Sequence, residues 1–252
     1  MAKPITGFSL GWIFDTVPDT ICNILRFLRK NDADAVELCL DPVRLRHMVL
    51  FLNQELHASL APFDYVSLHL PEITCRKNDS LTDEVARQIV SLLSVFNVHA
   101  LVVHPDTIED WDSLARYNKN TFNGKIAVEF PMDKDKKSGR AIEELIEIYD
   151  NFPDFSFVLD VQHAYENDPI GNLAIEAAEI MSSRLQHLHV SGQKQNADSV
   201  SRHAYLFEAD NQADIKEVLA NEIFDGVPRI SEGEFKALDA DAVSSELKAI
   251  AS

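Results

Sequence analysis

The feature that most constrains the fold of this 252-residue chain is a regular alternation of short apolar runs with amphipathic segments. The runs are rich in β-branched and apolar residues and recur at intervals of roughly thirty residues, as strands separated by helices do. Eight candidate strands result: Ile5–Leu10, Ala35–Leu40, Tyr65–Leu70, Ala100–His104, Lys125–Phe130, Phe155–Asp160, Leu185–Val190 and Val227–Glu232.

The segments between these runs carry apolar residues at helical spacing, three or four positions apart. The clearest sets are Ile21, Ile24, Leu25 and Leu28; Leu45, Val49, Leu52 and Leu56; Val85, Ile89, Leu92 and Phe96; and Ile142, Leu145, Ile146 and Tyr149. Strands that alternate with helices form right-handed crossovers and a parallel sheet. Eight such units in about 250 residues match the size of a closed barrel.

The sequence therefore predicts a single-domain (β/α)8 TIM barrel over residues 1–252. A doubly wound open sheet is the alternative, but no glycine-rich nucleotide-binding motif follows any candidate strand. The stretch Ser191–Asp210, after the seventh run, is predicted to be an irregular loop that overhangs the barrel mouth.

Composition narrows the classes of partner. The formal net charge of −18 repels polyanions, so binding to nucleic acid or to an anionic membrane is not expected. The three cysteines are an odd number and have no C-x-x-C spacing, which suits neither a disulfide framework nor a thiolate zinc site, and we expect buried free thiols. With no secretory leader pattern and no long apolar stretch, we expect a soluble cytoplasmic protein. The chain could form a homo-oligomer, and the sequence leaves this question open.

Polar residues gather at the carboxyl ends of the candidate strands, where a barrel enzyme builds its site. Six strand ends carry a histidine or a carboxylate: His69, His104, Glu129, Asp160, His189 and Glu232. His163 follows Asp160 by three residues and can reach the same rim. Burying such groups without compensation would cost several kcal/mol each. Imidazoles and carboxylates are ligands of zinc, manganese, iron or cobalt, so we predict that a divalent ion binds there.

These motifs resemble the xylose isomerase-like TIM barrel superfamily, which includes sugar phosphate isomerases and epimerases and the type IV AP endonucleases. The resemblance runs from about Ala35 to Glu234. The endonucleases hold three zinc ions with nine ligands, and eight of those positions are matched. The matched residues are His69, His104, Glu129, Asp160, His163, His189, His203 and Glu232. The departure is Ser201, which stands where that family has an aspartate.

The sugar isomerases and epimerases need four ligands around one metal, and the resemblance assigns these to Glu129, Asp160, His189 and Glu232. The run Val36-Glu37-Leu38 is also closer to the isomerase-like members. Phe130 and Gly192 depart from residues that many relatives have at these positions.

Several residues keep two interpretations. His69, His104 and His203 bind either metal or substrate. His187 lies two positions before His189 on the same candidate strand, so by alternation it points to the same face but deeper in the barrel. It is expected to be a core histidine or to support a ligand. Glu37 and Arg202 are candidate substrate-binding residues. Glu37 is expected to face the barrel interior, where it orients either the ligands or a substrate hydroxyl, and burial against a lysine or arginine is an equal alternative.

Two enzymatic functions follow from one site. In the first, the enzyme is a metal-dependent isomerase or epimerase of a small carbohydrate, acting through an enediolate. Glu129 and Glu232 are then catalytic and exchange protons from opposite sides of the barrel. In the second, the enzyme is a multinuclear zinc phosphoesterase. The acidic charge, Ser201 and the acidic loop residue Glu72 argue against DNA as its substrate. A metabolite-binding barrel without turnover is the third class.

Overall fold

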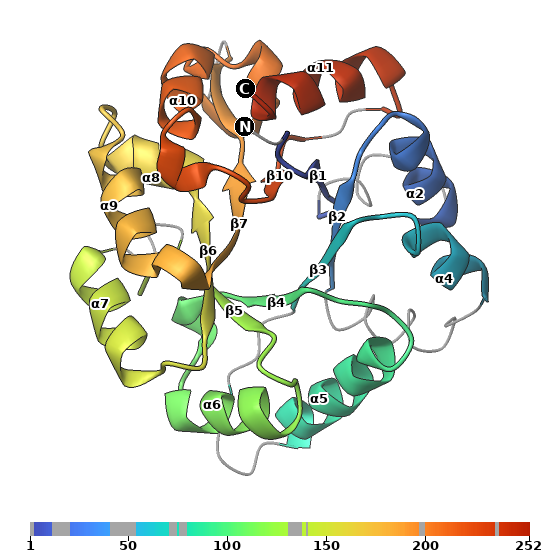
Figure 1. Ribbon diagram of the computed structural model, residues 1–252, viewed down its shortest axis with the longest axis vertical. Coiled ribbons are helices and arrows are strands. Elements are labelled where there is room, and N and C mark those ends of the chain that lie inside the picture. The colour runs from blue at the N-terminus through green and yellow to red at the C-terminus, as the bar shows by residue number, and fades with distance from the viewer. Residues whose placement is uncertain are drawn as a thin grey trace.

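The protein forms a closed barrel of parallel strands surrounded by helices (Figure 1). The computed structural model describes residues 3–11, 21–40, 54–70, 75, 80–130, 138–139, 141–196, 200–234 and 237–252. The strands follow the order β1-β10-β7-β6-β5-β4-β3-β2 around the barrel. Their bounds are β1 Thr6–Ser9, β2 Ala35–Cys39, β3 Tyr65–His69, β4 Ala100–Val103, β5 Ile126–Phe130, β6 Ser156–Asp160, β7 Leu185–Val190 and β10 Arg229–Ser231.

Helices form the outer ring (Figure 1). The α-helices are α2 Ile21–Lys30, α4 Gln54–Leu60, α5 Ser80–Leu93, α6 Trp111–Asn120, α7 Ile142–Asn151, α8 Val161–Asn167, α9 Asn172–Met181, α10 Gln212–Leu219 and α11 Ala240–Ile250. Short 3-10 helices span Pro105–Thr107, Ser182–Arg184, Leu206–Glu208 and Glu222–Phe224. The predicted (β/α)8 barrel is confirmed, and each predicted strand overlaps an observed one. Residues 41–53, which hold most of the second predicted helical set, lie outside the described residues.

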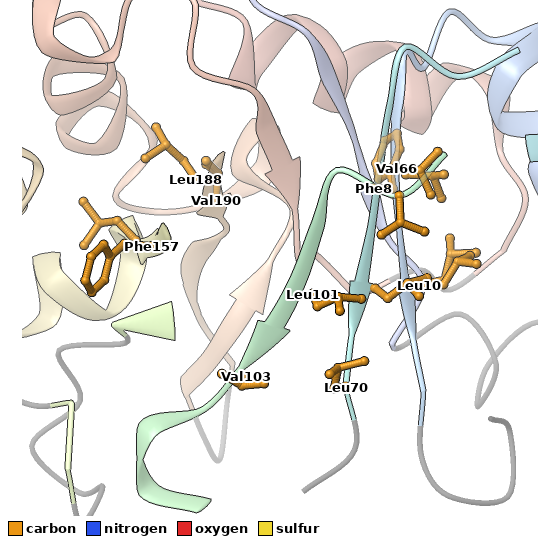
Figure 2. Close-up of a cluster of buried hydrophobic side chains, with 14 of the residues drawn as sticks. Phe8, Leu10, Val66, Leu70, Leu101, Val103, Phe157, Leu188 and Val190 are labelled. Carbon is orange, nitrogen blue, oxygen red and sulfur yellow. The ribbon is translucent and has the colours of Figure 1, made fainter. Parts of the chain in front are cut away.

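The main hydrophobic core lies between the barrel and the helices. Alternate residues of each strand point outward into it, including Phe8, Val66, Leu101, Phe157 and Leu188 (Figure 2). They are fully or almost fully buried, and in β1, β4 and β5 every residue of both faces is buried. This explains why the strands appear in the sequence as nearly continuous apolar runs.

The inside of the barrel has a different composition. Two small apolar clusters are separate from the main core: Ala100, Val102, Ala127 and Val158 on β4 to β6, and Ala35, Tyr65 and Ile230 on β2, β3 and β10. Next to them, three polar side chains, Glu37, Ser67 and His187, are fully buried. The barrel interior is therefore polar on one side below the strand ends, which positions the functional residues described next.

The segment after β7 differs from the prediction. The described residues of Ser191–Asp210 are mostly regular: β8 Gly192–Gln195 and β9 Val200–Ala204 pair as antiparallel strands, followed by the 3-10 helix Leu206–Glu208. The hairpin is anchored because Gln193 N donates to Asn211 Oδ1 at 2.8 Å. Polar strands of this kind lack the apolar pattern that marks the barrel strands, so the sequence did not reveal them.

The three cysteines are free, as predicted, but only Cys75 is buried, while Cys22 and Cys39 are partly exposed. Within the described residues, no helix has the length and apolar character needed to cross a membrane.

Candidate metal centre

The carboxyl ends of the strands bring the predicted ligands together in two groups. Glu129, His189 and Glu232, with His69 and His104, meet inside the barrel. Asp160, His163 and His203 form a neighbouring group on β6, α8 and β9. The two groups adjoin because Asp160 and His189 are register partners on β6 and β7.

His189 lies at the centre of the first group. Its Nδ1 atom is 3.3 Å from Glu129 Oε1 and 3.4 Å from Glu232 Oε1. Nδ1 is buried and makes no hydrogen bond to any described residue. Ligand atoms around a tetrahedral zinc ion with bonds of about 2.0 Å are separated by about 3.3 Å. His189 Nδ1 lies at about this distance from each of the two carboxylate oxygens, so it could share a divalent ion with either carboxylate.

A second set of ligand atoms lies on the other side of the Glu129 carboxylate. Glu129 Oε2 is 3.1 Å from His69 Nε2 and 3.6 Å from His104 Nε2, and the two imidazole rings are 4.8 Å apart. These atoms are close enough to share one ion. Glu129 therefore faces both sets, one with each oxygen, as a carboxylate that bridges two metal ions does.

Asp160 uses its two carboxylate oxygens differently at the rim. Through Oδ1 it caps the N-terminus of α8, because this oxygen accepts a hydrogen bond from His163 N at 3.0 Å. Its Oδ2 lies 3.7 Å from His163 Nε2. The ring of His163 meets that of His203 edge-on at 5.5 Å. The capping bond fixes the side chain and leaves Oδ2 directed toward these imidazoles.

Burial and mutual attraction between histidines and carboxylates determine the electrostatics of the first group. Burial acts to lower the pKa of His189, but the charges of Glu232, Glu37 and Glu129 outweigh it and hold the pKa well above its ordinary value. Burial raises the pKa of Glu232 to about 7, with His189 opposing and Glu129 adding to the shift. Burial also acts to raise the pKa of Glu129, but His104 and His189 keep it well below its ordinary value.

Glu37 lies behind His189 rather than at the open side of the site. It is fully buried, and its oxygens are 3.1 Å and 3.3 Å from His189 Nε2. Burial acts to raise its pKa, but His189 and His187 hold the pKa well below the ordinary value. Of the alternatives that the sequence left open for Glu37, this position favours the orienting of a ligand over contact with a substrate, and the partners of Glu37 are histidines rather than a lysine or arginine.

Arg202 lies on β9, with its side chain 43% exposed and its Nε 3.5 Å from Glu166 Oε1. Glu166 also accepts a hydrogen bond from Gln162 and lies 3.5 Å from His163 Nδ1. A half-exposed guanidinium beside the rim histidines is accessible to a ligand. Its assignment to substrate binding stays a prediction.

Two features of the site differ from the sequence interpretation or were missed by it. The strands that carry Glu129 and Glu232, β5 and β10, are not opposite: only β6 and β7 lie between them. Tyr65 and Ser67, which contact His187 and Glu37, were not singled out. The available signal was their period of two with His69 on one strand, which places all three on the inner face.

A comparison with protein-family models finds no family that matches, and a comparison with curated proteins finds no similar sequence. Solved structures do share the fold. The probable 3-DHS dehydratase AsbF from Bacillus anthracis aligns over 98% of both chains with a TM-score of 0.68 and 13% identity. The D-allulose 3-epimerase from Methylomonas sp. aligns over 98% of this chain and 97% of its own, with a TM-score of 0.64 and 14% identity.

The 3-keto-D-glucoside 4-epimerase YcjR from E. coli aligns over 98% of both chains, with a TM-score of 0.61 and 16% identity. At these identities the likeness concerns the fold alone. The barrel fold that the resemblance implied is confirmed by these structures.

Proposed function

We propose that this protein is a divalent-metal-dependent isomerase or epimerase that acts on a sugar or sugar phosphate through an enediolate. The observation that carries the proposal is the approach of two carboxylate oxygens, from Glu129 and Glu232, to the buried Nδ1 of His189. Zinc and manganese both suit this ligand set. Two of the solved structures with this fold are epimerases of D-allulose and of a 3-keto-D-glucoside, which supports a carbohydrate as substrate.

Isomerases and epimerases of this kind remove a proton from a carbon beside a carbonyl and return it. A divalent ion held by Glu129, Asp160, His189 and Glu232 would polarise that carbonyl and acidify the adjacent C–H bond. Glu129 and Glu232 are the proposed proton carriers, because they reach the site from strands with two others between them. They can thus approach one carbon from different directions. Arg202, half exposed on β9, is proposed to hold a substrate hydroxyl or phosphate.

The test is exchange of solvent deuterium into the carbon beside the carbonyl, measured by NMR on a panel of three- to six-carbon ketoses and their phosphates. Exchange requires only removal and return of a proton, so it is visible even when net conversion is small. Glu232→Gln keeps an oxygen ligand but removes the basic carboxylate. We expect exchange to fall by roughly two to four orders of magnitude while metal stays bound.

Glu234→Gln is the matched control, because Glu234 lies two residues further along and its backbone N donates to His203 O. Its exchange rate should stay near that of the parent enzyme. Absence of exchange for the whole panel with the metal-loaded parent enzyme would refute the proposed function, as would full exchange in Glu232→Gln.

A multinuclear zinc phosphoesterase is the second candidate. The observation that favours it is the second set, in which His69 and His104 approach the remaining oxygen of Glu129. A one-metal isomerase does not require these histidines, whereas two ions bridged by a carboxylate suit displacement at phosphorus.

Metal analysis by mass spectrometry and cleavage of a simple phosphodiester distinguish the candidates. Two or three zinc ions per chain together with cleavage would make the phosphoesterase the first choice. Because the net charge is −18, we expect no measurable binding to duplex DNA containing an abasic site at physiological salt. Salt-sensitive binding accompanied by incision would contradict that expectation.

A further inference from the structure

We propose that Glu37 is a positioning residue that keeps a proton on Nε2 of His189, so that Nδ1 offers its lone pair to the metal. This inference rests on the proposed metal dependence and concerns residues that do not themselves bind the ion. Glu37, Ser67, His187 and His189 are all fully buried, and Tyr65 nearly so. They connect β2, β3 and β7 beneath the metal centre.

The contacts form a chain that ends at the metal ligand. Tyr65 Oη is 2.9 Å from His187 Nδ1. On the other side of that ring, His187 Nε2 is 3.3 Å from Glu37 Oε2. Glu37 Oε2 also accepts a hydrogen bond from Ser67 Oγ at 2.9 Å. The same carboxylate contacts His189 Nε2, at 3.1 Å to Oε1 and 3.3 Å to Oε2.

The direction of these hydrogen bonds follows from Tyr65. A buried tyrosine hydroxyl must donate its hydrogen, and His187 Nδ1 is its only side-chain partner among the described residues. His187 Nδ1 therefore accepts, and the ring carries its hydrogen on Nε2, which lies 3.3 Å from Glu37 Oε2 and 3.2 Å from His189 Nε2. Glu37 Oε2 thus accepts from Ser67 Oγ and has the N–H of His187 close by.

A neutral, metal-binding His189 has two arrangements. If it carried its hydrogen on Nδ1, the lone pair of Nε2 would face the buried Glu37 carboxylate, 3.1 Å from Oε1 and 3.3 Å from Oε2. With the hydrogen on Nε2, His189 donates to Glu37 Oε2 at 3.3 Å. A buried carboxylate is stabilised by a donor and not by a facing lone pair, so Glu37 favours Nε2–H. Nδ1 is then left to face Glu129 and Glu232.

The nitrogens of His187 and His189 and the Glu37 carboxylate are also close enough to suggest an ion among themselves. An ion there would need the lone pairs of both Nε2 atoms, which are 3.2 Å apart. The donation from Tyr65 puts a hydrogen on one of them, so the cluster is better suited to orient a ligand than to bind metal. Carboxylates that accept from a metal-binding histidine are common in metal sites.

The experiment measures zinc affinity of the purified chain by competition with a chromophoric chelator. In Glu37→Gln the amide has one acceptor oxygen for three donors, and its NH2 group can stabilise the wrong tautomer of His189. We expect zinc binding to weaken by about 10- to 100-fold. Glu176→Gln is the matched control, because it makes the same chemical change at an exposed position of α9, outside this chain of contacts, and its zinc affinity should equal that of the parent.

NMR of histidine 15N nuclei in the zinc-loaded parent protein supplies a second readout. His189 should show a hydrogen on Nε2 and zinc on Nδ1. Tyr65→Phe removes the hydroxyl that donates to His187 and should weaken zinc binding less than Glu37→Gln does. This variant keeps the proposal testable if Glu37→Gln does not fold.

Equal affinity of Glu37→Gln and the parent, or zinc on Nε2 of His189, would overturn the inference while leaving the metal centre intact. If Glu37→Gln bound one zinc ion fewer per chain than the parent, the cluster of Glu37, His187 and His189 would itself be a metal site, and the inference would also be overturned. A parent protein that binds no metal would refute both the inference and the metal dependence of the proposed function.

Discussion

Glu246 on α11 allows a quantitative test of the structure behind the metal centre. It is fully buried. Its carboxylate accepts one hydrogen bond from Ser231 Oγ at 2.6 Å and another from Phe207 N at 3.1 Å. It thereby connects α11 to β10 and to the 3-10 helix after the hairpin. Burial raises the pKa of Glu246 to about 7, although the hydrogen bond from Ser231 opposes the shift. Replacing Glu246 with Gln keeps the shape and removes the ionisation.

The size of the effect follows from the two pKa values. In the unfolded chain the carboxyl ionises near 4.5, and in the folded protein near 7. Between these values the unfolded state binds fewer protons, so stability falls as the pH rises. The stability that protonated Glu246 contributes below pH 4.5 is lost by about pH 8, when the carboxyl is ionised in the folded protein. The difference between the folded and unfolded pKa values of Glu246 corresponds to roughly 3 kcal/mol of unfolding free energy. Glu246→Gln should therefore be more stable than the parent at pH 8 by up to that amount.

Urea unfolding of both proteins at several pH values between 4 and 8 measures the difference directly. All other titrating groups are shared, so the difference in unfolding free energy isolates Glu246. Glu176→Gln, at an exposed position of α9, controls for the chemical change itself. A difference that does not vary with pH would mean that Glu246 titrates alike in both states, and the reasoning would be wrong.

Two further predictions concern the rim. Asp160→Ala and Asp160→Asn should both lose the metal, as measured by mass spectrometry after reconstitution, but only the alanine variant should also lose about 1 kcal/mol of stability, because asparagine still caps α8. Metal retained at full occupancy in either variant would contradict the assignment. Arg202→Gln should raise KM and change kcat little if the guanidinium binds the substrate equally in the ground and transition states. An unchanged KM in steady-state kinetics would argue against that contact.

The barrel could be predicted because each strand leaves a local signal. Ala35–Cys39 and Ile126–Phe130 are apolar runs buried on both faces, and the helices between strands show their own period. The residues at the strand ends could also be found, since a histidine or carboxylate that ends an apolar run stands out. Parallel strands of a closed barrel bring all such ends to one mouth.

The partners of these residues could not be predicted, because they depend on ring orientation and on contacts between distant parts of the chain. Tyr65 and His187 are 122 positions apart, and Glu37 and His189 are 152 apart. Alternation places Glu37 inside the barrel but does not say whether it faces a substrate, a cation or a histidine. The hairpin of β8 and β9 was missed for a related reason: polar strands at the rim bury too little to need an apolar pattern.

The uneven interior of the barrel follows from what His189 needs on its two sides. At the level below the metal centre, β4, β5 and β6 contribute only the small apolar side chains of Ala100, Val102, Ala127 and Val158. At the same end, β2, β3 and β7 contribute a carboxylate, hydroxyls and an imidazole. A buried carboxylate is stable only with donors around it, and each donor must have its own partner. If Glu37 is to support His189, the carboxylate therefore needs donors of its own, which are Ser67 and His187, and His187 needs Tyr65. The strands that do not contact the His189 ring can be filled with small apolar residues.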